Sequence, residues 1–373
     1  MFRWTLRRFR HDPAAHGRSL LVRMDIINRC NSRCFMCPYV GYLESGAPTQ
    51  AMDSALFERI AARIFPYTCH LALSCAFEPL LHPRFRDLLA IAARHGVPEW
   101  GVVTNASLLD EKMAAAILDS RMPALALSLD GVTRETYRAI RGIDAFDAVL
   151  ANIRRLQEMK RRAGVDHPHL FANFVLMRRN LDEVVPYLAL CRELGVEDVT
   201  FVHVMPRSRE NAQSLLNDPD RYAAVYREAK RIAESGPMRV LLPAPFTPDE
   251  LAAAGPADRE RRLQQSRADD LRTGGAQTAL LPVEGAGDDI FCASPWMMVF
   301  ISPNGDVHPC SHRQNDPPFG NLAVSSFQEI WNGPAYLELR RRLYRHRLEG
   351  LCRTCEAFTP NSEPMVRRPI RIL

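Results

Sequence analysis

Three closely spaced cysteines near the start of the chain are the residues best suited to chemistry. Cys30, Cys34 and Cys37 stand in the run Cys-Asn-Ser-Arg-Cys-Phe-Met-Cys. Cysteine thiolates are the usual protein ligands of iron–sulfur clusters. Three of them on one short loop can hold a [4Fe–4S] cluster and leave its fourth iron open. An open coordination position is typical of a reactive metal site, whereas a filled shell is typical of a structural one.

The spacing Cys-x3-Cys-x2-Cys resembles the signature of the radical S-adenosylmethionine (SAM) enzymes. In that family the amino and carboxylate groups of SAM chelate the open iron. The resemblance implies that the reduced cluster cleaves SAM to methionine and a 5′-deoxyadenosyl radical, which takes hydrogen from a C–H bond. The alternatives are a zinc site completed by a distant fourth ligand, or three unrelated thiols.

A second set of four cysteines lies in the C-terminal part of the chain: Cys292, Cys310, Cys352 and Cys355. Four thiolates can form a closed site for zinc or for a fully ligated [4Fe–4S] cluster, and spacing does not separate the two. Pro295-Trp296, the Gly305-x4-Cys310 element and the Cys-x2-Cys pair resemble the SPASM/twitch extension of radical SAM enzymes. The SPASM pattern continues with further cysteines, but none follows Cys355. The resemblance therefore implies the shorter twitch form, with one auxiliary cluster held by all four; a zinc ribbon is the alternative.

Strands and helices alternate from about residue 20 to residue 235. Apolar runs predict strands at 20–27, 70–74, 100–104, 124–128, 170–177 and 199–204. Amphipathic patterns predict helices at 53–65, 84–95, 110–120, 145–163, 182–194 and 218–235. Six strand–helix units in series indicate an α/β fold with a parallel sheet, either doubly wound or curled into a barrel. The family resemblance implies a partial (β/α)6, TIM-like barrel; in either case ligands bind at the C-terminal strand ends.

We expect four regions along the chain. They are an N-terminal arm at 1–19, the radical SAM partial barrel at 20–235, a linker or lid at 236–290 and a small twitch domain at 291–373. Pro, Ala, Gly and charged residues dominate the third region, which predicts at most one helix, around 256–269. In the fourth region we expect a strand at 297–301, a turn at 303–306 and a second strand at Val307, which together form a β-hairpin.

The resemblance also implies a set of SAM contacts at predicted strand ends. Residues 74–79, Ser-Cys-Ala-Phe-Glu-Pro, stand where the family has Gly-Gly-Glu-Pro, so Glu78 should bind the SAM amino group. Ala76 and Phe77 replace the glycines, which changes the backbone contacts of this element. The rest of the expected pocket consists of a backbone contact to the adenine, contacts to the ribose and a contact to the SAM carboxylate. The expected SAM-binding residues are Met36, Glu78, Asn105, Ser128 and Arg141; for Arg141 the alternative is an ordinary surface arginine.

The four-cysteine twitch arrangement resembles radical SAM dehydrogenases that act on alcohol carbons of sugars and aminocyclitols. We therefore expect an oxidoreductase that oxidises a polar small molecule and passes the second electron to the auxiliary cluster. Candidates for the base that removes the hydroxyl proton are His203, Arg207 and His312, with His308 as a further candidate.

Other outcomes stay open at this stage. An epimerase would need a thiol that returns hydrogen to the substrate, and Cys75 is the cysteine placed for that role. A peptide-modifying maturase is a second alternative, and a non-catalytic scaffold with two zinc sites is a third.

Composition narrows the possible environments and partners. Of the 373 residues, 47% are hydrophobic and 24% charged, as in ordinary globular proteins. The net charge of +5 comes without a basic stripe interleaved with aromatics, so nucleic acid is not implied. We find no apolar run of about 20 residues and no signal peptide, so ten cysteines indicate metal binding in a reducing cytoplasm. The expected partners are a small-molecule substrate and a flavodoxin- or ferredoxin-type electron donor.

Overall fold

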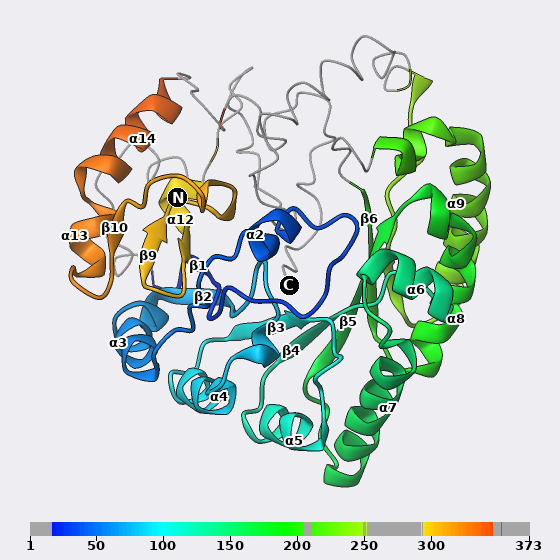
Figure 1. Cartoon of the computed structure of the whole chain (residues 1–373), viewed down its shortest axis with the longest axis horizontal. Coiled ribbons are helices and arrows are strands. Elements are labelled where there is room, and N and C mark those ends of the chain that lie inside the picture. Colours follow the sequence, from blue (N-terminus) through cyan, green and yellow to red (C-terminus); the bar gives the residue numbers. More distant parts are fainter. Residues whose placement is uncertain are drawn as a thin grey trace. The chain divides into compact units, whose positions relative to one another are not determined.

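The computed structural model describes residues 17–204, 211–248, 251, 292, 294–345 and 352. The chain divides into two compact units. The first contains Met1–Arg29, Pro48–Val102 and Thr273–Leu373, and the second contains Cys30–Ala47 and Val103–Arg272. Each unit combines mostly parallel strands with helices (Figure 1). The α/β class that the sequence predicts is therefore confirmed.

The first unit joins the first strands of the chain to its C-terminal hairpin. Strand β1 (Leu20–Met24) pairs in parallel with both β2 (Thr68–Ala72) and β8 (Met298–Ile301). Strand β8 then pairs antiparallel with β9 (Asp306–His308), and β9 with β10 (Gly320–Asn321). Figure 1 shows this hairpin, in yellow, beside β1. The predicted C-terminal β-hairpin therefore forms, and it extends the same sheet as β1 and β2.

Two helices of the first unit, α3 (Ser54–Ile64) and α13 (Phe327–Trp331), begin at polar caps. Asp53 caps α3 by accepting hydrogen bonds from the N–H groups of Ala55 and Leu56. A capping box between Ser326 and Glu329 begins α13. The remaining elements of this unit are η2 (Phe65–Tyr67), η3 (Pro79–Leu81), α4 (Phe85–Arg94), the first part of β3 (Glu99–Thr104), α12 (Ser294–Met297), η7 (Ser311–Arg313) and α14 (Pro334–Tyr344), with α3 at Ser54–Ile64 and α13 at Phe327–Trp331.

The second unit contains four parallel strands in the order β4-β5-β6-β7. They are β4 (Ala124–Ser128), β5 (His169–Leu176), β6 (Asp198–His203) and β7 (Arg239–Leu241). Its longer helices are α5 (Glu111–Asp119), α6 (Arg134–Arg141), α7 (Phe146–Ala163), α8 (Val184–Glu193) and α9 (Pro219–Glu234). Shorter elements are α2 (Val40–Glu44), η4 (Arg178–Glu183), η5 (Asn211–Gln213) and η6 (Leu215–Asn217). Figure 1 shows α7, α8 and α9 on one side of β5 and β6.

Helix α6 and strand β7 of the second unit differ from the sequence-based expectation. Helix α6 was not predicted, because its eight residues carry little apolar surface; Thr133 begins it and Gly142 ends it with φ 69°. Strand β7 lies in the region predicted as a linker, where only three residues pair with β6. Most other boundaries agree within two residues, although the first strand ends at Met24 rather than at residue 27. The predicted helix at 256–269 and nearly all of the N-terminal arm lie outside the described residues.

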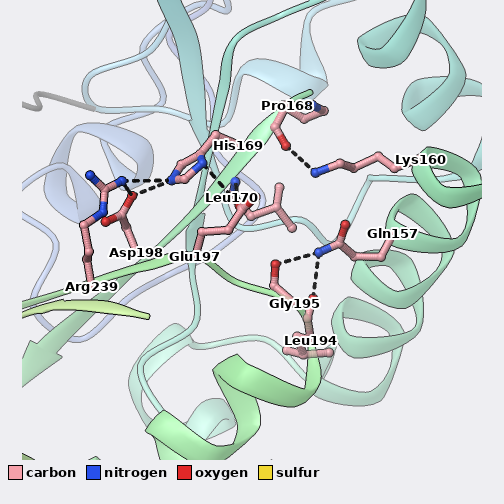
Figure 2. A network of polar contacts seen from close by, with 10 residues as sticks. All are labelled: Gln157, Lys160, Pro168, His169, Leu170, Leu194, Gly195, Glu197, Asp198 and Arg239. Carbon is pink, nitrogen blue, oxygen red and sulfur yellow. Dashed lines mark hydrogen bonds and ion pairs between the residues drawn. The ribbon is translucent and has the colours of Figure 1, made fainter. Parts of the chain in front are cut away.

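A polar network fixes the amino ends of β5, β6 and β7 (Figure 2). Asp198 pairs with both His169 and Arg239, so one carboxylate joins the first residues of three strands. From α7, Lys160 Nζ donates to the carbonyl of Pro168 at 2.7 Å and Gln157 Nε2 to that of Gly195 at 2.7 Å. These contacts hold the amino ends of the strands, and His203, a predicted base, is the last residue at the other end of β6.

No helix among the described residues is both long enough and apolar enough to cross a membrane.

Candidate functional site

The loop that carries Cys30, Cys34 and Cys37 is held by backbone hydrogen bonds to the end of α6. The N–H of Arg33 donates to the carbonyl of Arg141 at 3.1 Å, and the N–H of Phe35 donates to that of Ile140 at 2.7 Å. Both carbonyls belong to the last turn of a helix, where no helical partner is available for them. The unpredicted helix α6 therefore positions the cysteine loop.

Gly142 allows this close approach. It has φ 69°, and a Cβ built on it would lie 2.5 Å from the carbonyl oxygen of Arg33. A side chain at this position would have to push the cysteine loop away. Glycine is therefore required here both for its left-handed backbone and for its lack of volume.

A ring of side-chain hydrogen bonds holds the same loop from the end of β3. Asn105 Nδ2 donates to Asn31 Oδ1 at 2.8 Å and to Ser32 Oγ at 3.1 Å. Asn31 Nδ2 donates to Ser107 Oγ at 2.8 Å, and the Ser107 hydroxyl donates back to Asn105 Oδ1 at 2.6 Å. Asn105, an expected SAM contact, thus bonds directly to the cysteine loop.

A buried ion pair lies beside Cys34. Arg141 Nη1 donates to Asp130 Oδ2 at 2.8 Å, and Asp130 Oδ1 accepts from the N–H of Val175 at 2.7 Å. Burial raises the pKa of the Cys34 thiol to about 12, while the positive charge of Arg141 acts in the opposite direction. Metal ligands must be thiolates, so Cys34 fits a site in which bound iron supplies further positive charge.

Arg141 also has one hydrogen-bond donor that the ion pair does not use. Its Nε is buried and has no hydrogen-bond partner among the described residues. An unsatisfied buried guanidinium N–H is costly, so it fits a site that an anionic group completes. This observation favours the assignment of Arg141 to the SAM carboxylate over an ordinary surface arginine, because its residue is only 8% exposed.

Apolar side chains pack beneath the cysteine loop. Met36 and Phe35 are partly buried against the cluster of Ile140, Met177 and Val204. The guanidinium carbon of Arg179 lies 4.3 Å from the centroid of the Phe35 ring, at cation–π distance. Met36 is therefore anchored by its side chain, which leaves its backbone available for the expected adenine contact.

Glu78 is buried in the first unit. Its residue is 2% exposed, its N–H donates to the carbonyl of Arg29 at 2.9 Å, and its Oε1 accepts from the N–H of Leu80 at 3.1 Å. Arg29 directly precedes Cys30 in the sequence. The position of Glu78 at the start of η3, just beyond β2, agrees with the predicted ligand edge.

Asp25 is a site residue that sequence reasoning missed. Its Oδ1 accepts from the N–H groups of Cys75 at 2.7 Å and Ala76 at 3.1 Å, in the segment that leads to Glu78. Burial raises its pKa to about 6, and these N–H groups act in the opposite direction. The available signal was a lone acidic residue within the apolar run predicted as the first strand, residues 20–27.

The other expected contacts lie at separate strand ends. Ser128 is the last residue of β4 and is half-buried. His203 is the last residue of β6, where its ring stacks on Phe246 with centroids 4.8 Å apart and meets Tyr222 edge-on at 5.0 Å. Arg207 lies outside the described residues.

Two cysteines of the second set pack against an aromatic and aliphatic cluster in the first unit, and a third lies near Tyr336. Cys292 and Cys352 both pack, with Phe319, against the cluster formed by Trp296, Leu339 and Leu343. Cys310 immediately precedes η7 and interacts electrostatically with Tyr336, whose ring meets that of Phe319 at 5.0 Å. Residues 60 positions apart in sequence thus share one apolar core, as an auxiliary cluster site requires; Cys355 lies outside the described residues.

The two histidines near Cys310 are largely shielded. Burial lowers the pKa of His312, in η7, and the nearby Arg23 acts in the same direction. Burial also lowers the pKa of His308, which lies in β9 and is 3% exposed. Both imidazoles therefore favour the neutral form, which a base requires, and His308 is the less accessible of the two.

The nine described cysteines form no disulfide with one another. Among the described residues, no three His, Cys, Asp or Glu side chains are arranged to hold a single metal ion. The geometry of a four-iron cluster is a different one, because its thiolates bind separate irons.

Two family models match the chain. Residues 24–185 match the radical SAM superfamily, and residues 292–356 match the iron–sulfur cluster-binding domain called SPASM. The matched ranges contain both sets of cysteines. The distinction between the full SPASM form and the shorter twitch form stays a prediction.

Curated relatives and solved structures agree with these matches. Proteins named probable GTP 3′,8-cyclase from Saccharolobus islandicus and Metallosphaera sedula are 26% and 25% identical over 185 and 193 residues. These matches cover 50% and 51% of this chain and 57% and 58% of the relatives, so the chain matches little more than half of their length.

Two SAM-bound structures share the fold: Streptococcus suis SuiB has a TM-score of 0.62 and 14% identity, with 86% of this chain and 68% of SuiB covered. The other, anSMEcpe, has a TM-score of 0.60 and 16% identity, and the match covers 91% of this chain and 87% of anSMEcpe. The largely parallel strands of the described residues accordingly agree with the partial-barrel architecture that was predicted.

Proposed function

Because the chain belongs to the radical SAM superfamily and carries a C-terminal SPASM domain, we propose that it is an oxidoreductase acting on a polar small molecule. The observation that carries this proposal is the presence of two separate cysteine sets. The first has three members on one loop, which leaves an iron open for SAM. The second, with four, has no need of an outside ligand.

The cofactors are SAM and [4Fe–4S] clusters, and the residues present fit both. When bound, SAM and its cluster supply a radical that takes a hydrogen atom from a C–H bond. Oxidation of an alcohol carbon removes two hydrogens; the second leaves as a proton and an electron. A second cluster gives this electron a destination, which supports dehydrogenation as the outcome.

The chain's own residues bind and orient SAM in this proposal. Glu78 accepts from the amino group, and the unpartnered Nε of Arg141 donates to the carboxylate. Ser128 bonds the ribose, and the backbone of Met36 faces the adenine. Asn105 keeps the cysteine loop in place while contributing to the pocket wall. The buried Nε of Arg141 supports this role, because a buried guanidinium N–H without an acceptor is costly.

His203 is the base that the geometry favours. It ends β6, at the strand edge where ligands bind in this class of fold, and aromatic rings fix its orientation. Neutral imidazole can accept the hydroxyl proton of an alcohol near neutral pH. Arg207 and His312 remain further candidates for this role.

An acidic one-electron carrier of the flavodoxin or ferredoxin type is the proposed electron donor. Arg33, Arg138 and Arg179 are exposed and lie on three segments that contact one another around the cysteine loop. None of the ion pairs among the described residues includes any of the three. Exposed positive charge beside a redox centre supports docking of a negatively charged partner.

We assign the chemistry to two regions. Residues 20–235 would cleave SAM, with β7 as an added strand, and residues 291–373 would hold the auxiliary cluster. The segment at 236–290 would connect them as a linker or lid.

Peptide modification is the second candidate function. SuiB has been solved with a precursor peptide bound, and anSMEcpe with Cp18Cys and Kp18Cys peptides bound. The likeness of fold to two peptide-binding enzymes favours this alternative over epimerisation.

A deuterium-transfer assay separates these functions. The anaerobically reconstituted protein is reduced in the presence of SAM and a deuterated substrate, either an aminocyclitol, a sugar or a peptide. The proposal predicts deuterium in 5′-deoxyadenosine and a product two mass units lighter than an undeuterated alcohol substrate. Deuterium transfer from a peptide alone would replace it with the second candidate, and absence of SAM cleavage by iron-loaded protein would refute both.

A further inference from the structure

We infer that Asp25 is a positioning residue for SAM binding: its carboxylate holds the backbone at 75–76 so that Glu78 meets the SAM amino group. This inference rests on the proposed role of Glu78. It assigns a function to a residue that carries no part of the cysteine motifs.

The contacts of Asp25 are specific to one segment. Its residue is 2% exposed, and Oδ1 alone accepts from two successive N–H groups, those of Cys75 and Ala76. Oδ2 is also buried but has no hydrogen-bond partner among the described residues. A carboxylate in this arrangement is costly to bury, so its position calls for an explanation beyond packing.

The sequence of the segment explains the need for this carboxylate. The Gly-Gly-Glu-Pro element of the family is replaced by Ala76-Phe77-Glu78-Pro79. Residues with a Cβ have a narrower choice of backbone conformation than glycine. A carboxylate that accepts from successive N–H groups stabilises one of the remaining backbone conformations. That conformation sets the direction of the Glu78 side chain.

Glu78 itself is fixed from the other side. Its N–H is bonded to the carbonyl of Arg29 and its carboxylate to the N–H of Leu80. Two residues of the stretch 25–29 therefore bond to the segment 75–78. Asp25 does so through its side chain, and Arg29 does so through its backbone carbonyl. Removal of the Asp25 carboxylate would abolish the hydrogen bonds to residues 75–76, which precede Glu78.

A double-mutant cycle on SAM affinity tests this inference. SAM dissociation constants are measured by equilibrium dialysis on the iron-loaded full chain for D25A, E78Q and D25A/E78Q, with D25N as the conservative variant. We expect D25A to weaken SAM binding by about tenfold or more, or ~1.4 kcal/mol. The same change in the E78Q background should have an effect of less than about threefold, because residues that act through one another are not additive. D25N keeps Oδ1 as an acceptor and should stay within about threefold of the unmodified protein.

Three results would overturn the inference: full additivity, an unchanged affinity of D25A, or equal losses in D25A and D25N. If E78Q leaves SAM affinity unchanged, the assignment of Glu78 fails, and that failure belongs to the proposed function. Weak binding in E78Q together with normal binding in D25A is a failure of the present inference alone.

Hydrogen exchange supplies a readout that does not need SAM. In D25A the amides of residues 75–76 should exchange at least about tenfold faster, whereas D25N should retain their protection. Equal protection in D25A and the unmodified protein would contradict the inference even if D25A failed to load iron. Exchange in the amides of α3 serves as the control for a general loss of stability.

Discussion

The guanidinium of Arg141 and the carboxylate of Asp130 form a buried ion pair with an Nη1–Oδ2 distance of 2.8 Å. Arg141 ends the helix whose last carbonyls hold the cysteine loop, and Asp130 also binds the N–H of Val175 in β5. Burial lowers the pKa of Arg141, but the neighbouring Cys34 and Asp130 outweigh this and raise it. One pair therefore connects a strand, a helix and a cluster-binding loop in the second unit.

Removal of either member of this pair should destabilise the protein strongly. R141M leaves the Asp130 carboxylate buried without its partner, and D130N leaves the guanidinium in the same condition. Each should lower the free energy of unfolding by ~3–5 kcal/mol, since an uncompensated buried charge remains. Urea denaturation monitored by circular dichroism measures this loss.

The exposed ion pair between Arg134, the first residue of α6, and Asp144 is the matched control. Its side chains are 58% and 38% exposed, so R134A should leave the urea midpoint nearly unchanged. Equal effects of R141M and R134A would contradict the importance assigned to burial.

Gly142 and Gly164 provide a second matched comparison. Both end helices with positive φ, of 69° and 64°, but only at Gly142 would a Cβ meet the cysteine loop. G164A should cost ~1–2 kcal/mol from backbone strain alone. G142A should cost more and should also lower the iron bound at the first cluster, as measured by iron and sulfide content. A normal iron content in G142A would show that the loop adapts to the added methyl group.

The protonation of Asp25 should make stability depend on pH. Its pKa in the folded protein is about 6, above the ordinary 3.8, so the folded state binds this proton more tightly than the unfolded state. The resulting stability is complete below about pH 4 and is lost as pH rises through about 6. A rise of about two in pKa corresponds to ~3 kcal/mol.

Asn does not titrate, so D25N is the reference for this effect. The unmodified protein should lose ~3 kcal/mol relative to D25N between about pH 4 and pH 7. Urea midpoints of the two proteins, measured in parallel across this range, give the difference. A difference that stays constant with pH would show that Asp25 is already ionised at low pH in the folded state.

Charge reversal around the cysteine loop should impair reduction by a protein donor. The variant R138E/R179E should slow reduction by reduced flavodoxin by about tenfold or more at low salt, because opposite charges steer association. Reduction by dithionite, which needs no docking surface, should be unchanged. Stopped-flow absorbance follows both reactions, and R227E, which reverses an exposed charge on α9, is the control. Equal slowing with both reductants would indicate a damaged cluster instead.

Loss of a cysteine from the second set should remove one cluster and leave the other. The C310S variant should fall from about eight to about four irons per chain, because each cubane holds four. Cleavage of SAM by the dithionite-reduced variant should persist, while oxidation of the substrate should stop. C191S, which alters a buried cysteine in α8, should keep the full iron content. Loss of all iron in C310S would mean that the two sites are not independent.

Local features of the fold were readable from the sequence because they depend on residues close together in the chain. Asp53 caps α3 as predicted, and Gly164 ends α7 in the left-handed conformation. Strand β4 has the predicted bounds. The spacing of Cys30, Cys34 and Cys37 indicated the family directly, because a cluster ligand set on one loop is itself a local pattern.

The supports of the site depended on tertiary structure. Asp25 bonds to Cys75, 50 residues away, and Asn105 bonds to Asn31, 74 residues away. Helix α6 is short and largely polar, so periodicity did not reveal it, yet its last carbonyls fix the cysteine loop. The pairing of β8 with β1 likewise joins strands from opposite ends of the chain.

The sequence by itself determined the family and its cofactors, since the cysteine spacing that indicates them is fixed by covalent order. The fold decided how those cysteines are held, because a hydrogen bond between distant residues leaves no local pattern and forms only where the backbone brings donor and acceptor together. Gly142 illustrates both contributions, that of the sequence and that of the fold. Its presence after a helix was visible in the chain, but the reason for it, a carbonyl of the cysteine loop 2.5 Å from where a Cβ would lie, belongs to the structure alone.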